Sequence, residues 1–284
     1  MMMNKFILTM QYNESFFLPI FLRHYSQYFD PKNIFVIDHG SDQNLIPPEF
    51  NRIYIPRDKP FSELERLDFI KGICTGLMRY YDVGIFADTD ELIYLNDFNY
   101  EALKDSSPLH VAGFDCTVLE IDGKKKLIGI PVPFLCKAMI FNKTPDWSIG
   151  FHAVVNLELP EFFYIPMAHL KYLSESECNI RNISRASTYE KMNAFEKGHG
   201  IDLHWRDHRE DHLNFNKVIA DSIKKNAINT FTPIKSEPLF TMNSLKDFIG
   251  NQPSDFIYQP IDCIWDPSRI TDLTTFFPQI IEHY

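Results

Sequence analysis

Four short apolar segments in the first 90 residues have the length and apolar content of buried strands. They cover residues 4–10, 34–38, 52–55 and 83–87. After Phe17, apolar residues recur at three- and four-residue spacing, which predicts an amphipathic helix to Tyr28. A second helix is predicted from Ser62, which has capping-box spacing to Glu65, to about Tyr80. This alternating order predicts a mostly parallel sheet with right-handed crossovers.

The pattern after residue 90 is typical of antiparallel or mixed pairing. Apolar stretches at 111–121 and 126–130 flank Asp122-Gly123, a strong signal for a tight hairpin turn. Further strand candidates follow at 137–141, 153–159, 162–165 and 167–172. The sequence therefore places a second kind of strand pairing after the parallel part.

The hydrophobic pattern weakens from about residue 182. Ser187 and Glu190 have capping-box spacing, for a short helix that ends at Gly198. Residues 213–224 form another helix candidate. The tail from Asn226 carries many Pro, Asn and Asp residues, and we expect it to wrap the core.

Acidic side chains follow two of the predicted strands directly. Asp38 ends the second strand, and Asp88, Asp90 and Glu91 follow the fourth. Ligands of open α/β sheets bind at the carboxyl ends of the strands. In extended backbone Asp88 and Asp90 share a side, where they could hold a hard divalent cation. The alternative is an acidic turn after a strand, because Asp is also a good turn former.

Composition narrows the classes of partner and compartment. The net charge of -10 argues against non-specific binding to nucleic acid or to an anionic membrane surface, and an anionic substrate would need a local cation. The five cysteines are odd in number and widely spaced, as expected of reduced thiols in a cytosolic protein. We expect no membrane span and no signal peptide, and a cytoplasmic location, free or peripheral at the inner membrane face.

Several of these segments together resemble the GT-A-fold glycosyltransferases, and within them the family-2-like enzymes of bacterial saccharide synthesis. The resemblance rests on Tyr12-Asn13-Glu14, Asp38-His39-Gly40-Ser41-Asp42, the D-x-D motif in Asp88-Thr89-Asp90-Glu91, Cys136-Lys137, Gly150-Phe151-His152 and His169-Leu170-Lys171-Tyr172. It implies a Rossmann-like α/β fold, with a mixed sheet flanked by helices. The core would cover 1–180, and a helical or irregular extension, 181–284, would pack on it.

The resemblance also implies an activity and its partners. A sugar would pass from a nucleotide-diphosphate donor to an acceptor hydroxyl on a saccharide, a lipid-linked saccharide or a protein. A Mn²⁺ or Mg²⁺ ion bound to both phosphates would stabilise the charge of the leaving group. Asp90 would ligate this ion directly, Asp88 would contact it through water or bind the ribose, and a histidine would add a ligand. His169 is preferred to His152 for that ligand, because it follows an apolar strand and precedes Lys171.

Other roles are carried over in the same way. Asp38 would hydrogen-bond the nucleotide base, with Asn13 or Glu14 lining the pocket. Arg66 and Lys171 join the donor-binding set, the latter because its charge could meet the phosphates. Catalytic roles fall to His152, which would position donor or acceptor, and to Asp146 as the base, with Trp147 stacking on a sugar face. A Pro-Asp turn is the simpler explanation of Asp146.

Three rival interpretations remain at this point. Nucleotidyl transfer commonly uses a glycine-rich basic loop after the first strand, and Gln11-Tyr12-Asn13-Glu14-Ser15 has neither glycine nor lysine. A zinc site could use His204, His208 and His212, although charged neighbours make that segment look solvent-exposed. A catalytically inactive nucleotide-binding or scaffold module of the same fold is the third.

Overall fold

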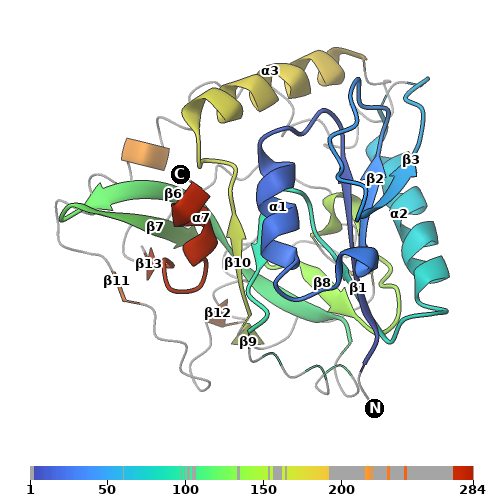
Figure 1. Cartoon of the computed structure of the whole chain (residues 1–284), viewed down its shortest axis with the longest axis horizontal. Helices are drawn as coiled ribbons and strands as arrows, with labels where there is room; N and C mark the ends of the chain where they lie inside the picture. Colours follow the sequence, from blue (N-terminus) through green and yellow to red (C-terminus); the bar gives the residue numbers. More distant parts are fainter. Residues whose placement is uncertain are drawn as a thin grey trace.

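A computed structural model describes residues 3–191, except residue 60, most of 97–106, residues 133–134 and most of 153–164. Beyond residue 191 it describes 215–217, 219, 229–230, 240–241 and 271–283. Within this part of the chain the protein is an α/β structure with a mixed, mostly open sheet flanked by helices (Figure 1). This architecture is compatible with a Rossmann-like fold.

Four parallel strands form one half of the sheet, in the order β3-β2-β1-β4. They are β1 (Lys5–Gln11), β2 (Ile34–Asp38), β3 (Asn51–Tyr54) and β4 (Val83–Phe86), each within one residue of its predicted bounds. Every residue of β4 is buried, as a strand covered on both faces requires. A Cβ atom on Gly84 would lie 2.4 Å from the Phe141 ring, so β4 has no room for a larger residue there.

Antiparallel strands form the other half of the sheet. β8 (Ala138–Phe141) joins β4 to β6 (Leu109–Ile121), which pairs with β7 (Lys124–Pro131). The predicted hairpin is confirmed: Asp122 and Gly123 both have positive φ, 52° and 71°, as its two-residue turn requires. Two short strands, β5 (Glu91–Ile93) and β10 (Ile165–His169), branch from this half.

Short peripheral strands complete the described pairing. β9 (Phe162–Phe163) pairs with β12 (Phe240–Thr241), and β13 (Thr271–Asp272) joins β7 to β11 (Asn229–Thr230). Most of the predicted strand 153–159 lies outside the described residues, and Val154 forms an isolated bridge with Trp147.

Helices cover both faces of the parallel half. α1 (Phe17–Tyr25) lies on one face and α2 (Glu63–Leu77) on the other, while α7 (Pro278–His283) packs beside α1 and against β7 of the antiparallel half (Figure 1). Side chains of β1 alternate accordingly, Ile7 packing on the α1 side and Phe6 and Leu8 on the α2 side. Both helices end about three residues before the predicted limit. The Ser62 hydroxyl caps α2 by accepting a hydrogen bond from the Glu65 amide, as predicted.

The third long helix corrects one prediction. α3 (Glu175–Lys191) passes straight through Ser187 and Glu190, so these residues do not cap a later helix. The N-terminus is set earlier, where Ser174 accepts a hydrogen bond from the Glu177 amide in the same S-x-x-E spacing. The predicted boundary at residue 180 therefore falls inside this helix, which lies above α1 across the top of Figure 1.

The described end of the chain packs on the core as expected of the tail. Phe277 and Ile280 are buried in the cluster that contains α1, and the Gln279 amide lies 2.5 Å from Nδ1 of buried His24. Among the described residues, no helix is both long and apolar enough to cross a membrane. The four described cysteines, Cys74, Cys116, Cys136 and Cys178, are buried and none of them is in a disulfide.

Candidate functional site: acids at the switch point of the sheet

The candidate site lies at the carboxyl ends of β1 and β4. From β1 the chain proceeds to β2 and β3 on one side, and then returns to β4 on the other side of β1. Neighbouring strands whose connections leave in opposite directions form a crevice at their carboxyl ends, the usual ligand position in such sheets. Glu14 follows β1 at this crevice, and Asp88 to Glu91 follow β4.

The D-x-D segment is a tight turn and not the extended backbone expected from the sequence. The Glu91 amide donates to the Asp88 carbonyl at 2.9 Å, and the Asp88 amide donates to Oε2 of Glu91 at 3.1 Å. This turn connects β4 to β5 and gives the two aspartates different partners. The acidic turn and the candidate site acids, given as alternatives above, are therefore one and the same segment.

Asp88 is bound by two cations from different elements. Arg66 of α2 donates to its Oδ1, and Nζ of Lys137 lies 3.7 Å from its Oδ2. Lys137, which directly precedes β8, is nearly fully buried and also contacts Oε1 of Glu91 at 2.5 Å. Burial alone would raise the pKa of Asp88, but the charges of Arg66 and Lys137 outweigh it and lower that pKa. Asp88 is therefore held as a carboxylate.

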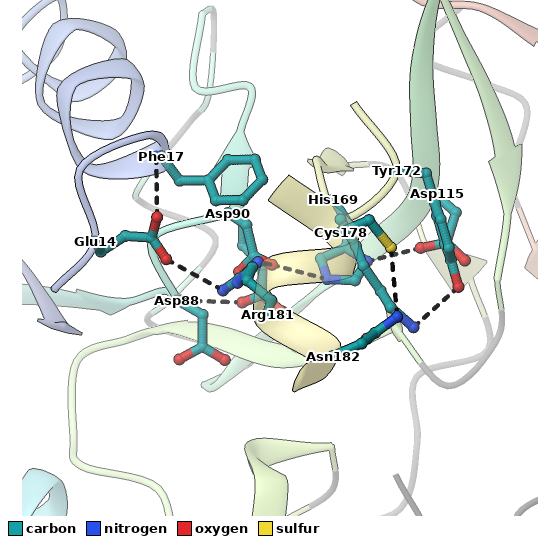
Figure 2. A network of polar contacts seen from close by, with 12 residues as sticks. Glu14, Phe17, Asp88, Asp90, Asp115, His169, Tyr172, Cys178, Arg181 and Asn182 are labelled. Atoms are coloured by element: carbon teal, nitrogen blue, oxygen red, sulfur yellow. Dashed lines mark hydrogen bonds and ion pairs between the residues drawn. The ribbon is translucent and has the colours of Figure 1, made fainter. Parts of the chain in front are cut away.

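Asp90 is bound by a second pair of cations (Figure 2). Arg181 of α3 donates to its Oδ2, and Nε2 of His169 lies 3.4 Å from the same oxygen. Burial again opposes the charged form, yet Arg181 and His169 hold the pKa of Asp90 well below its ordinary value. The Asp90 carbonyl also accepts the Leu170 amide at 2.7 Å, which fixes the turn against the end of β10.

Glu14 faces the same guanidinium from the loop after β1. Its Oε2 lies 3.6 Å from a terminal nitrogen of Arg181, and its Oε1 accepts the Phe17 amide at 3.2 Å (Figure 2). Burial raises the pKa of Glu14 despite the nearby Arg181 charge. Arg181 also lies over the Phe17 ring, 4.7 Å from its centroid. One side chain of α3 thus bridges the loops that follow β1 and β4.

Strand register brings His169 to Asp90. β10 pairs with β5 and β6 so that His169 lies opposite Glu91 on one side and opposite Asp115 on the other. Nδ1 of His169 is 2.7 Å from Oδ1 of Asp115. Burial would lower the pKa of His169, but Asp90 and Asp115 outweigh it and raise that pKa to about 9. His169 is therefore an imidazolium at neutral pH, donating from both nitrogens.

The raised pKa of His169 predicts a specific loss of stability in mild alkali. The folded state holds this proton up to about pH 9 and the unfolded state only to about 6.5, so the stabilisation is complete below pH 6.5 and is lost as the pH rises through 9. At about 1.4 kcal/mol per pKa unit, the loss is about 3 kcal/mol. Urea unfolding from pH 6 to 9.5 should show this decline for wild type and not for His169→Asn. Parallel curves for the two proteins would contradict it.

The loops after β1 and β2 are tied together by hydrogen bonds between polar side chains, some buried and some exposed. Oδ1 of Asp38 accepts from the Gln11 side chain and the Ser41 amide, and its Oδ2 accepts from Arg52 at 2.9 and 2.6 Å. Asn13, with a φ of 51°, exchanges two hydrogen bonds with Asp42. Asp38 is fully buried, and both its oxygens are engaged in shaping these loops; the predicted contact with a nucleotide base stays a prediction.

An aromatic and cationic surface adjoins these loops. The Arg57 guanidinium lies 4.0 Å from the centroid of the Tyr12 ring and 5.6 Å from that of Phe61. Tyr12 is exposed, and the half-buried His39 lies beside Phe61. Burial, followed by the charges of Arg57 and Arg66, lowers the pKa of His39. A flat ring and a guanidinium at this edge can receive a planar, polar ligand group.

The remaining predicted residues lie outside the acid and cation cluster. Trp147 is buried and donates its indole N–H to the Ala138 carbonyl at 2.8 Å, so the prediction that it stacks on a sugar is wrong. The exposed carboxylate of Asp146 pairs with Lys71 of α2. His152 folds back over Gly150, and Nζ of Lys171 donates to the Tyr172 hydroxyl at 3.0 Å.

Sequence reasoning gave no site role to three charged residues of the cluster, although Lys137 belongs to one of the motifs that carry the resemblance. Asp115 interrupts an apolar strand and Lys137 directly precedes one, which is a usable signal because buried charges are almost always paired. Arg181 has no such signal, since it lies on an amphipathic helix 91 residues from its partner Asp90. Only the tertiary structure places it in the site.

The predicted metal ligands do not fit a metal ion in this arrangement. Within the described residues, no three His, Cys, Asp or Glu side chains form a group that could hold one. Oδ2 of Asp90 is engaged by Arg181, and a protonated His169 has no lone pair to donate. The position between Asp90 and Glu14 already holds a cation, the guanidinium of Arg181.

The alternative zinc ligands, His204, His208 and His212, lie outside the described residues. Comparison with known proteins adds no assignment: no protein-family model matches the chain, and no curated protein matches its sequence. The function is therefore argued from the site itself.

Proposed function

We propose that this protein is a glycosyltransferase that moves a sugar from a nucleotide-diphosphate sugar to an acceptor hydroxyl. The observation that supports this most is the position of Asp88 and Asp90, at the carboxyl end of a buried parallel strand and at the switch point of the sheet. Glu14, from the loop after β1, faces the same point through Arg181. The proposal combines this position with the resemblance of the D-x-D motif and its neighbouring segments to those of GT-A-fold glycosyltransferases.

The charges of the site suit a diphosphate. Four cations from separate elements contact the acids after β4. They are Arg66 of α2, Lys137 just before β8, His169 of β10 and Arg181 of α3. Each cation is also paired with an acid, so the cluster offers an anionic ligand cations in fixed positions and not a net positive charge, on a protein with a net charge of -10. As a glycosidic bond breaks, charge grows on the diphosphate, and cations fixed in advance stabilise it.

We assign the nucleotide end of the donor to the loops after β1 and β2. The exposed Tyr12 ring and the Arg57 guanidinium offer stacking and charge to a base and its phosphates. Asn13 lies beside them in the loop that Asp42 holds. The acceptor is a saccharide, a lipid-linked saccharide or a protein, in the synthesis of a polysaccharide, lipopolysaccharide or other glycan.

Melting temperature against a panel of nucleoside diphosphates and nucleotide sugars tests this function. A ligand that binds only the folded state at 100 times its Kd adds about 2.7 kcal/mol, which for a chain of this size raises Tm by roughly 5 °C. We expect such a shift with one nucleoside diphosphate and a smaller one with its monophosphate, and we expect that diphosphate to be released from its nucleotide sugar when an acceptor hydroxyl is supplied to take the sugar.

The same panel, extended to nucleoside triphosphates and repeated with Mn²⁺, separates this function from its rivals. A shift without turnover for any acceptor would favour the inactive binding module. A shift only with nucleoside triphosphates would favour nucleotidyl transfer. No shift with any nucleotide, with or without Mn²⁺, would contradict a donor site.

A further inference from the structure

We propose that Arg181 is the resident cation of the D-x-D site and that it takes the position of the divalent metal ion expected from the sequence. Its guanidinium bridges Asp90 and Glu14, one acid from each strand of the switch point. Metal ion and guanidinium compete for the same oxygens, so a metal does not bind the donor-free protein while Arg181 is in place. The inference takes from the proposed function only the assignment of these acids to the donor site.

The geometry around Arg181 is that of a fixed counter-ion. One terminal nitrogen donates to Oδ2 of Asp90, the other lies 3.6 Å from Oε2 of Glu14, and the guanidinium packs over the Phe17 ring at 4.7 Å. Its side chain is only 21% exposed, and the acids raise its already high pKa. A surface arginine with mobile partners would have none of these constraints.

Electrostatics makes the competition strong. A divalent ion at Asp90 would lie within a few ångströms of the Arg181 guanidinium, and like charges at that distance repel strongly in a partly buried site. Without Arg181, the carboxylates of Asp90 and Glu14 would lose their shared counter-ion. Two carboxylates facing one gap are the oxygen ligands that Mn²⁺ and Mg²⁺ prefer.

Titration of the full chain with Mn²⁺ alone, followed by the electron paramagnetic resonance signal of free Mn²⁺, tests the inference. We expect Arg181→Gln to bind one Mn²⁺ at least about tenfold more tightly than wild type, because one repelling charge is gone. Arg181→Lys, which keeps the charge, and Arg79→Gln, which removes a charge from an exposed turn residue, should both behave as wild type. A thermal melt of each variant confirms that it is folded.

Several results would overturn the inference. If the wild-type protein bound Mn²⁺ with micromolar affinity in the absence of nucleotide, that result by itself would overturn the inference, even if Arg181→Gln failed to fold. Equal affinity of wild type and Arg181→Gln, no Mn²⁺ bound by either protein, or tight binding by Arg181→Lys would also do so. No nucleotide is present, so the outcome is independent of the panel that tests the proposed function.

Discussion

Replacement of Asp90 with asparagine is expected to abolish sugar transfer and to lower the free energy of unfolding by about 3–5 kcal/mol. The substitution preserves shape but removes the charge shared by Arg181 and His169. Two partly buried cations then lack their closest counter-ion, and the pKa of His169 falls because Asp90 is the strongest influence that raises it. The large effect follows from burial, since Asp90 is only 3% exposed.

Urea unfolding at pH 7 and a transfer assay with the donor identified by the nucleotide panel measure the two effects. Asp122→Asn is the matched control: it removes one carboxylate from the exposed hairpin turn, where asparagine tolerates the φ of 52°, and should change stability by less than about 0.5 kcal/mol. Wild-type turnover in Asp90→Asn would show that the D-x-D motif has been misassigned. A stability loss no larger than that of Asp122→Asn would show that the ion pairs of Asp90 with Arg181 and His169 do not stabilise the folded state.

The second large effect is expected for Lys137→Met, which should lose about 3–5 kcal/mol of stability at pH 7. The Lys137 ammonium lies 2.5 Å from Glu91 and 3.7 Å from Asp88, in a position only 5% exposed. Methionine fills a similar volume but leaves the buried Glu91 carboxylate without its counter-ion. Burial already raises the pKa of Glu91, and Lys137 is what opposes that rise.

The sign of the pH dependence distinguishes this mechanism from simple loss of packing. Without Lys137 the pKa of Glu91 rises further above its ordinary 4.5, so the folded state takes up a proton before the unfolded state does. The deficit of Lys137→Met relative to wild type should therefore shrink as the pH falls from 7 towards 4.5. Adding Glu91→Gln, which removes the unpaired charge, should recover much of the loss at pH 7. A deficit that is constant with pH and unaffected by Glu91→Gln would indicate lost packing alone.

The secondary structure was largely predictable because its signals are local. The strand from Val83 to Phe86 and the cap at Ser62 depend on residues within a few positions of each other. The wrong prediction that a helix begins at Ser187 has a local cause as well. Two S-x-x-E spacings lie close together, and the spacing alone does not say which begins the helix; the one from Ser174 does.

The candidate site was predictable only in part. Asp88, Asp90 and Glu14 were found because acids that follow parallel strands gather at one edge of a sheet. Trp147 was misplaced because a loop sequence does not show which side chains the fold will bury, and the role of Asp146 as the base stays a prediction. His169 was selected from its place after an apolar strand, and the register of β10 against β5 and β6 puts it beside Asp90.

The sequence by itself determined the strands and helices, the parallel half of the sheet and the acids at its carboxyl edge. Hydrophobic periodicity carries that information, because each element must bury one face and each residue's face follows from its neighbours. Only the tertiary structure decided which cation meets which acid. Arg66, Lys137, His169 and Arg181 come from four separate segments, and Arg181 is 91 residues from Asp90. Charge pairs form wherever packing brings two side chains together, so the separation of two charged residues along the chain does not predict whether they will pair.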